Sequence, residues 1–118
     1  MLLTKFSHSC VRLEKDGAVL VVAPGTFSEV EEALAGADTV LVTHVHPDHC
    51  DVPRVAAVLE SAPGLSLHAP AAVVEELSQH VTDASRLHAV TAGTAFEAGP
   101  FSVTTHGGQH ALIHPLIP

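Results

Sequence analysis

The sequence predicts an α/β layered domain, in which a sheet is covered by helices. Residues 18–23 and 39–43 are continuous apolar segments, as is typical of strands buried on both faces. Segments with helical apolar spacing alternate with further short strands along the rest of the chain. With 118 residues and no linker, residues 1–118 are expected to form one domain, and the absence of Trp and Tyr indicates a largely aliphatic core.

The first elements are predicted to be strands followed by a short helix. Residues 2–7 and 9–14 are apolar-rich, and a turn at residues 15–17 leads into the strand at 18–23. Ser28 followed three residues later by Glu31 is a capping box, which predicts a helix to about residue 35.

Two more helices are predicted after the strand at 39–43. Asp51 is a suitable N-cap for a helix that continues to about residue 61. Pro70 suits the first position of the second helix. The remaining strands are expected at 65–69, 86–90, 94–97 and 100–105.

Composition and charge exclude several functional classes. Five Lys and Arg against thirteen Asp and Glu give a net charge of −8, too few cations to bind a phosphate backbone, so no nucleic-acid partner is expected. No apolar run approaches the roughly 18–20 residues that span a bilayer. The N-terminus lacks the features of a signal peptide, so we expect no membrane association and a cytoplasmic protein. Cys10 and Cys50 lack the C-x-x-C spacing of a redox pair.

Ten histidines are the outlier in the composition. Histidine is the commonest metal ligand among side chains. His68, His80 and His88 are expected to be ordinary surface residues. The other seven gather around three short segments, which indicates a shared role.

The central segment is an H-x-H-x-D-H cluster formed by His44, His46, Asp48 and His49, directly after an apolar strand. Side chains two residues apart in an extended segment project to the same side, so His44 and His46 can bind one metal together. Imidazole and carboxylate ligands suit zinc, and iron or manganese are alternatives. A catalytic zinc has about three protein ligands and an open position, and two metals can share one site.

A ligand from elsewhere in the chain is needed to complete such a site. His110 is the candidate, because Gly107 and Gly108 let the backbone pass close to a metal. His106 and His114 lie four residues to either side of it. They either support the ligands or substrate, or are merely exposed.

These motifs resemble those of the metallo-β-lactamase fold superfamily, whose signature is H-x-H-x-D-H after a buried strand. The resemblance is greatest to the branch that includes the L-ascorbate-6-phosphate lactonase-like proteins, on the segments 6–11, 22–25 and 107–110. It implies the N-terminal half of a four-layer αββα sandwich, with a mixed, mainly antiparallel sheet and helices on one face.

The resemblance also implies roles for individual residues. It makes His44, His46 and His110 the ligands of a first metal, and Asp48 and His49 ligands of a second. Asp48 would also hold the nucleophilic water. His8 resembles a residue near the mouth of the active site, where it would contact the metal ligands or the substrate.

The sequence departs from the branch in two places. Ala23 stands where the branch usually has an Asp before Pro-Gly, an acid that helps to brace the metal-binding loop. The second half of the fold, which brings a bridging Asp and a last His, does not follow His110. A half sandwich would expose an apolar inner sheet face. Either two chains pair as a homodimer through that face, or the chain is a fragment that depends on a missing piece.

Two functions therefore stand as hypotheses. The first is a zinc-dependent hydrolase that uses a metal-bound hydroxide on a small ester, lactone, amide or phosphoester. The alternative is a truncated, catalytically inactive half-domain that binds at most one metal. The acidic composition favours a small polar substrate over a polymer.

Overall fold

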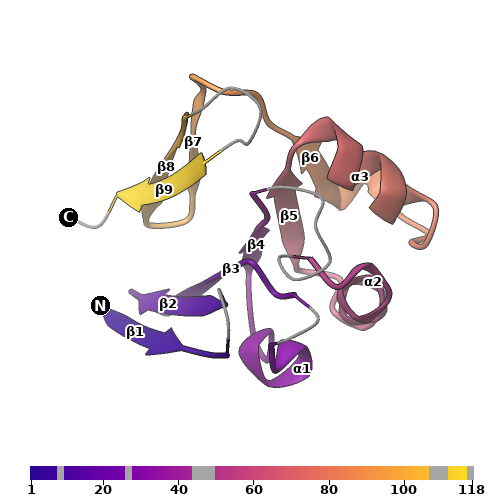
Figure 1. Cartoon of the computed structure of the whole chain (residues 1–118). Coiled ribbons are helices and arrows are strands. Elements are labelled where there is room, and N and C mark those ends of the chain that lie inside the picture. Colours follow the sequence, from indigo (N-terminus) through magenta and orange to yellow (C-terminus); the bar gives the residue numbers. More distant parts are fainter. Residues whose placement is uncertain (8–9, 26–27, 44–49, 107–111, 117–118) are drawn as a thin grey trace.

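The computed structural model describes residues 1–7, 10–25, 28–43, 50–106 and 112–116, the last range by its backbone alone. Within these ranges the chain forms two sheets that lie face to face, with helices on the outer side of the larger sheet (Figure 1). The predicted α/β fold class is confirmed.

The larger sheet has six strands, in the spatial order β1 (Leu2–Lys5), β2 (Val11–Lys15), β3 (Ala18–Val22), β4 (Thr39–Leu41), β5 (Ser66–Ala69) and β6 (Leu87–Ala89). The smaller sheet contains β7 (Ala95–Ala98), β8 (Phe101–His106) and β9 (Leu112–Leu116). The helices of the described residues are α1 (Val30–Ala33), α2 (Val52–Ser61), α3 (Ala71–Ser78) and the 3₁₀ turn η1 (Ala84–Arg86). None of these helices is long and apolar enough to cross a bilayer.

The larger sheet is mixed, as predicted, but three of its five pairings are parallel, so it is not mainly antiparallel. Strands β1, β2 and β3 pair antiparallel, whereas β3, β4, β5 and β6 pair parallel. The parallel part follows from the connections, because α1, α2 and α3 each carry the chain back across the sheet before the next strand. Both pairings of the smaller sheet are antiparallel.

Each face of the larger sheet has its own core. Val21 and Val40 pack with the helices, in a cluster that includes Val55 of α2. Leu20 and Leu41 belong to the other cluster, which faces the smaller sheet. Because both faces of this strand are buried, residues 18–23 lack the alternation of polar and apolar residues that a half-exposed strand shows.

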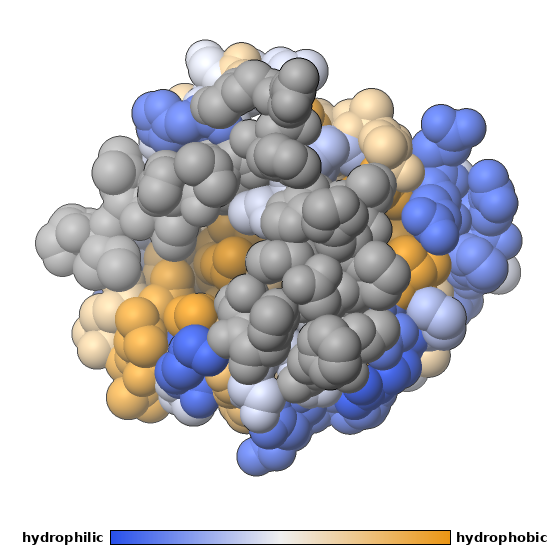
Figure 2. All heavy atoms as spheres, viewed as in Figure 1, coloured by the Kyte–Doolittle hydropathy of each residue, from blue (hydrophilic) through white to orange (hydrophobic). Residues whose placement is uncertain are grey.

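The smaller sheet covers the inner face that the sequence analysis expected to be exposed. Phe101 and Val103 of β8 are each 1% exposed and pack against Leu13, Leu20 and Leu41 of the larger sheet. The expectation of an open inner face was wrong, because β7, β8 and β9 belong to this chain and supply the opposing layer. Exposed large apolar side chains remain at the edge strand β1, where Met1, Leu2 and Leu3 are 53–58% exposed, and apolar surface is visible at the lower left of Figure 2.

Helix α1 begins without the predicted capping box. Its N-cap is Glu29, which makes no side-chain cap hydrogen bond. The Ser28 hydroxyl instead donates to the backbone carbonyl of Ser7, and the Glu31 carboxylate accepts from Arg54. Partners distant in sequence have replaced the local ones.

Strand β9 was absent from the sequence expectations. Pro115 lies within it, and a proline lacks the N–H that a central strand needs. In the described structure β9 pairs with β8 alone, on one side, so that the proline is tolerated.

His68 is not the ordinary surface residue that the sequence analysis expected. Its ring stacks on Phe96 of β7, with centroids 4.1 Å apart, and on His88 of β6 at 4.7 Å. It therefore joins the two sheets. Burial, and secondly the charge of His88, lower the pKa of His68 to about 4 from its ordinary 6.5. His80 and His88 are exposed, as expected.

Replacing Phe101 by Ala should lower the free energy of unfolding by about 3–5 kcal/mol, because it leaves a cavity between the sheets. Urea unfolding measures the change. Leu2→Ala is the control, since that side chain is 58% exposed and should change stability by less than about 0.5 kcal/mol. Similar small effects of both substitutions would contradict the packing of β8 on the larger sheet.

His68 should make the protein less stable in mild acid. Its folded-state pKa lies below its unfolded value, so between pH 6.5 and about 4 the unfolded chain binds more protons at this residue. The free energy of unfolding should therefore fall as the pH is lowered through this window. Urea unfolding at pH 7 and pH 5 should show a smaller fall for His68→Phe, and an unchanged fall for the exposed control His80→Gln. An equal fall in wild type and His68→Phe would contradict the assignment.

Candidate functional site

The parallel strands bring the chain segments that carry the candidate ligands to one edge of the larger sheet. The register pairs Val22 at the end of β3 with Leu41 at the end of β4. The segments that follow these two strands therefore leave the sheet side by side. In open α/β sheets, ligands bind outside this carboxyl edge.

The start of β2 lies at the same edge. Val11 pairs antiparallel with Val22, and the Phe6 N–H donates to the Cys10 carbonyl over 2.9 Å just before β2 begins. Residues 8–9, which include His8, therefore connect two described points at this edge.

The end of β8 is held at this edge by threonine contacts. The buried Thr105 hydroxyl donates to the Thr91 carbonyl and accepts from the Thr94 N–H at 2.9 Å. Thr91 directly follows Val90, whose N–H donates to the Ala69 carbonyl at the end of β5. The segment that carries His110 thus begins next to the carboxyl ends of β5 and β6.

Most of the predicted site residues lie outside the described residues. These are His8, His44, His46, Asp48, His49 and His110. Their segments start and end at described residues, and the topology brings these ends to a common edge. Within the described part of the chain, no group of three or more His, Cys, Asp or Glu side chains is placed to hold a metal ion. The predicted donor set of imidazoles and a carboxylate remains the candidate, and its chemistry fits zinc.

His106 is the last residue of β8, and its side chain lies on the outer face of the smaller sheet. Its side chain is exposed, and its Nε2 lies 3.1 Å from the Thr104 hydroxyl. Thr104 alternates with the buried Thr105 along β8, so it lies on the outer face of the smaller sheet. This position favours the interpretation of His106 as a surface residue. His114 lies in β9, where its backbone pairs with Thr104.

Ala23 occupies an unusual backbone position at the edge. It is buried, its φ is 56°, and its N–H donates to the Leu41 carbonyl over 2.9 Å. Asp and Asn are enriched at positive φ among residues other than glycine. The backbone is therefore suited to the acid that the resemblance implies here, whereas this chain offers no carboxylate.

Asp51 fixes the point at which the segment 44–49 joins α2. Its N–H donates to the Pro24 carbonyl over 2.9 Å, which connects this point to the segment after β3. Its carboxylate accepts from the Arg54 N–H at 3.3 Å, so Asp51 is the N-cap of α2, as predicted. The adjacent Cys50 is buried in the core.

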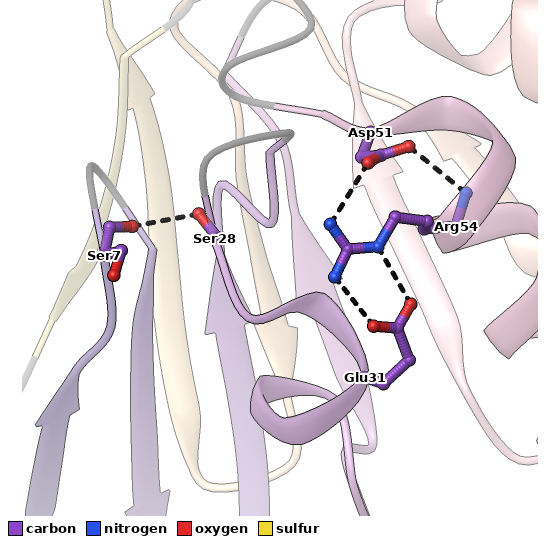
Figure 3. A network of polar contacts seen from close by, with 5 residues as sticks. All are labelled: Ser7, Ser28, Glu31, Asp51 and Arg54. Carbon is purple, nitrogen blue, oxygen red and sulfur yellow. Dashed lines mark hydrogen bonds and ion pairs between the residues drawn. The ribbon is translucent and has the colours of Figure 1, made fainter.

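Arg54 joins Asp51 to helix α1 (Figure 3). Its guanidinium donates two hydrogen bonds to Glu31, of 2.9 and 2.7 Å, and lies 3.4 Å from the Asp51 carboxylate. The hydrogen bond from Arg54 lowers the pKa of Glu31 to about 2. Sequence reasoning missed this network, because the two residues lie 23 positions apart in different helices.

A second group of contacts holds Ser7, directly before residues 8–9. The Ser7 N–H and hydroxyl donate to the Glu29 carboxylate over 2.9 and 2.8 Å. The Ser28 hydroxyl donates to the Ser7 carbonyl over 3.0 Å (Figure 3). Pro24, Ser28, Glu29 and Glu31 thus hold described residues beside two segments that carry predicted site residues.

Comparison with known families now identifies the fold family. A family model described as "Beta-lactamase superfamily domain" matches residues 2–116. The chain belongs to this family. In Mycobacterium tuberculosis, Protein Rv0786c is 38% identical over 118 residues, which are 100% of this chain and 53% of that protein. This beta-lactamase superfamily chain therefore spans about half the length of the curated relative that it matches.

Solved structures agree on the fold of this beta-lactamase superfamily chain. The metallo-beta-lactamase fold protein YhfI from Bacillus subtilis aligns with a TM-score of 0.71 at 20% identity, over 92% of this chain and 49% of that one. Igni18, a metallo hydrolase from Ignicoccus hospitalis, aligns with a TM-score of 0.69 at 19% identity, over 96% of this chain and 55% of that one. Both confirm that this chain corresponds to about half of a metallo-β-lactamase fold.

The two cysteines should be unreactive in the folded protein. Burial raises the pKa of the Cys10 thiol to about 11 and that of Cys50 to about 12, so both stay protonated near pH 8. Since the thiolate is the nucleophile, we expect little reaction with a disulfide reagent before denaturant is added. Spectrophotometric thiol titration at pH 8, with and without urea, measures this. Rapid reaction of either thiol in native buffer would contradict the buried positions.

Proposed function

We propose that this chain is a zinc-dependent hydrolase domain that acts on a small polar ester, lactone, amide or phosphoester. The observation that carries the proposal is that the described residues flanking three histidine-bearing segments lie at the carboxyl edge of the larger sheet. Their described ends lie at β2, at β4 and α2, and at β8. Membership of the beta-lactamase superfamily domain family supports it.

In this proposal His44, His46 and His110 hold one metal, and Asp48 and His49 contribute to a second position. A bound zinc would supply a Lewis acid and lower the pKa of water. Asp48 would orient the attacking water toward the substrate. His8 would lie near the entrance, because the described residues before and after it, Phe6 and Cys10, lie at the same sheet edge. The net charge of −8 supports a small substrate over a nucleic acid.

One observation favours a second candidate, a half-domain that binds at most one metal without turnover. The chain covers 53% of its curated relative and 49% and 55% of the two structures described above. In that case the ligand set for the second metal would be incomplete. The two candidates differ in metal content and in activity.

A homodimer remains a prediction, but the surface proposed for it changes from the inner sheet face to the edge strand β1. The inner face of the larger sheet packs on the smaller sheet of the same chain. The exposed large apolar side chains of the described residues are Met1, Leu2 and Leu3 on and beside the edge strand β1. A partner chain would therefore find apolar surface at this edge.

Metal content and activity should be measured on one sample. Elemental analysis gives zinc, iron and manganese per chain, and light scattering gives the mass. The same sample is assayed with nitrophenyl esters, a lactone and a phosphodiester. We expect close to two zinc ions per chain and turnover that a chelator abolishes. His46→Ala should lose both, whereas the exposed control His80→Ala should keep both.

The alternatives give different results. One zinc per chain without turnover would support the half-domain. A folded chain that takes up none of these metals would overturn both candidates.

A further inference from the structure

We propose that Glu31 and Arg54 are positioning residues for the candidate metal site, which act by holding Asp51 at the end of the segment 44–49. This inference rests on the metal site of the proposed function. It adds two residues that lie outside the predicted ligand set and belong to different helices.

The geometry connects the pair to the ligand segment in two steps. Arg54 donates two hydrogen bonds to the Glu31 carboxylate, 2.9 and 2.7 Å long, so the guanidinium is fixed in a planar fork. The same guanidinium lies 3.4 Å from the carboxylate of Asp51, two residues after His49. Without the hydrogen bonds to Glu31, the long Arg54 side chain would populate many rotamers and would hold Asp51 less firmly.

The backbone of Asp51 is the second fixed point. Its N–H donates to the Pro24 carbonyl, in the segment that leads to α1 and Glu31. Asp51, Arg54, Glu31 and Pro24 therefore form a closed connection between the loop after β3 and the start of α2. A change in the distance between α1 and α2 would move the point where the ligand segment ends.

The exposure of the three charged side chains indicates that the network contributes little to folding stability and that its main effect is on position. The Glu31 side chain is 63% exposed and that of Arg54 is 36% exposed, whereas Asp51 is 10% exposed. Exposed ion pairs contribute little to folding stability. Groups that orient metal ligands, in contrast, change metal affinity by roughly 10- to 100-fold when they are replaced. Residue 23, directly before Pro24, is an alanine and offers no carboxylate. The candidate metal site therefore depends more on the network of Glu31, Arg54 and Asp51.

The test compares zinc affinity with the stability of the metal-free protein. Zinc dissociation constants come from competition with a chromophoric chelator, and urea unfolding is measured in the chelated protein. The variants are Glu31→Gln, Arg54→Gln and the conservative Arg54→Lys. The matched control is Glu32→Gln, which removes an exposed carboxylate one residue away on the same helix.

We expect zinc to bind about 10-fold more weakly to Glu31→Gln and Arg54→Gln, with a smaller loss for Arg54→Lys, which keeps the charge but not the fork. The urea midpoints of these variants should stay near that of Glu32→Gln. Equal zinc affinity in Glu31→Gln and Glu32→Gln would overturn the inference. A loss of affinity that follows the loss of metal-free stability across the variants would also overturn it, because a general loosening of the fold would explain it. Failure of the wild-type protein to bind zinc is a separate result, which would overturn the proposed function itself.

Discussion

The parallel pairing of β3 with β4 is the constraint on which the candidate site depends. It aligns Val22 with Leu41, so the chain leaves both strands at the same level of the sheet. Burial on both faces fixes this register. A slip by one residue would move Leu41 from the core between the sheets to the core beneath the helices. Every other side chain of β4 would likewise change to the opposite face of the sheet.

Helix α1 is short, yet its residues and those directly before it organise the edge. Pro24 accepts the Asp51 N–H, Glu29 binds Ser7, and Glu31 binds Arg54. Glu29 and Glu31 therefore contact the chain before β2 and the start of α2, respectively. A rigid sheet that carries variable connecting segments is the usual way in which one fold supports different chemistry. Here Pro24, Glu29 and Glu31 couple those connections to one another.

Much of the fold could be predicted because strong local signals agree with the tertiary packing. The apolar runs at 18–23 and 39–43 became β3 and β4, and Asp51 caps α2. The predictions failed where tertiary contacts competed with local ones. Ser28 binds Ser7 instead of capping α1, and His68 stacks between the sheets. The same holds for the candidate site. The candidate ligands could be predicted from a local motif, whereas the Arg54 network could not, because it depends on the contact between two helices.

The sequence by itself determined the family and the α/β class and supplied the candidate metal ligands, because these depend on residue type and spacing along the chain. The tertiary structure alone decided which segments share an edge, that His106 lies on the outer face, and that the inner sheet face is covered by β7, β8 and β9. Such contacts join residues far apart in the chain. Their formation depends on how whole layers pack, and no local pattern of residues encodes it.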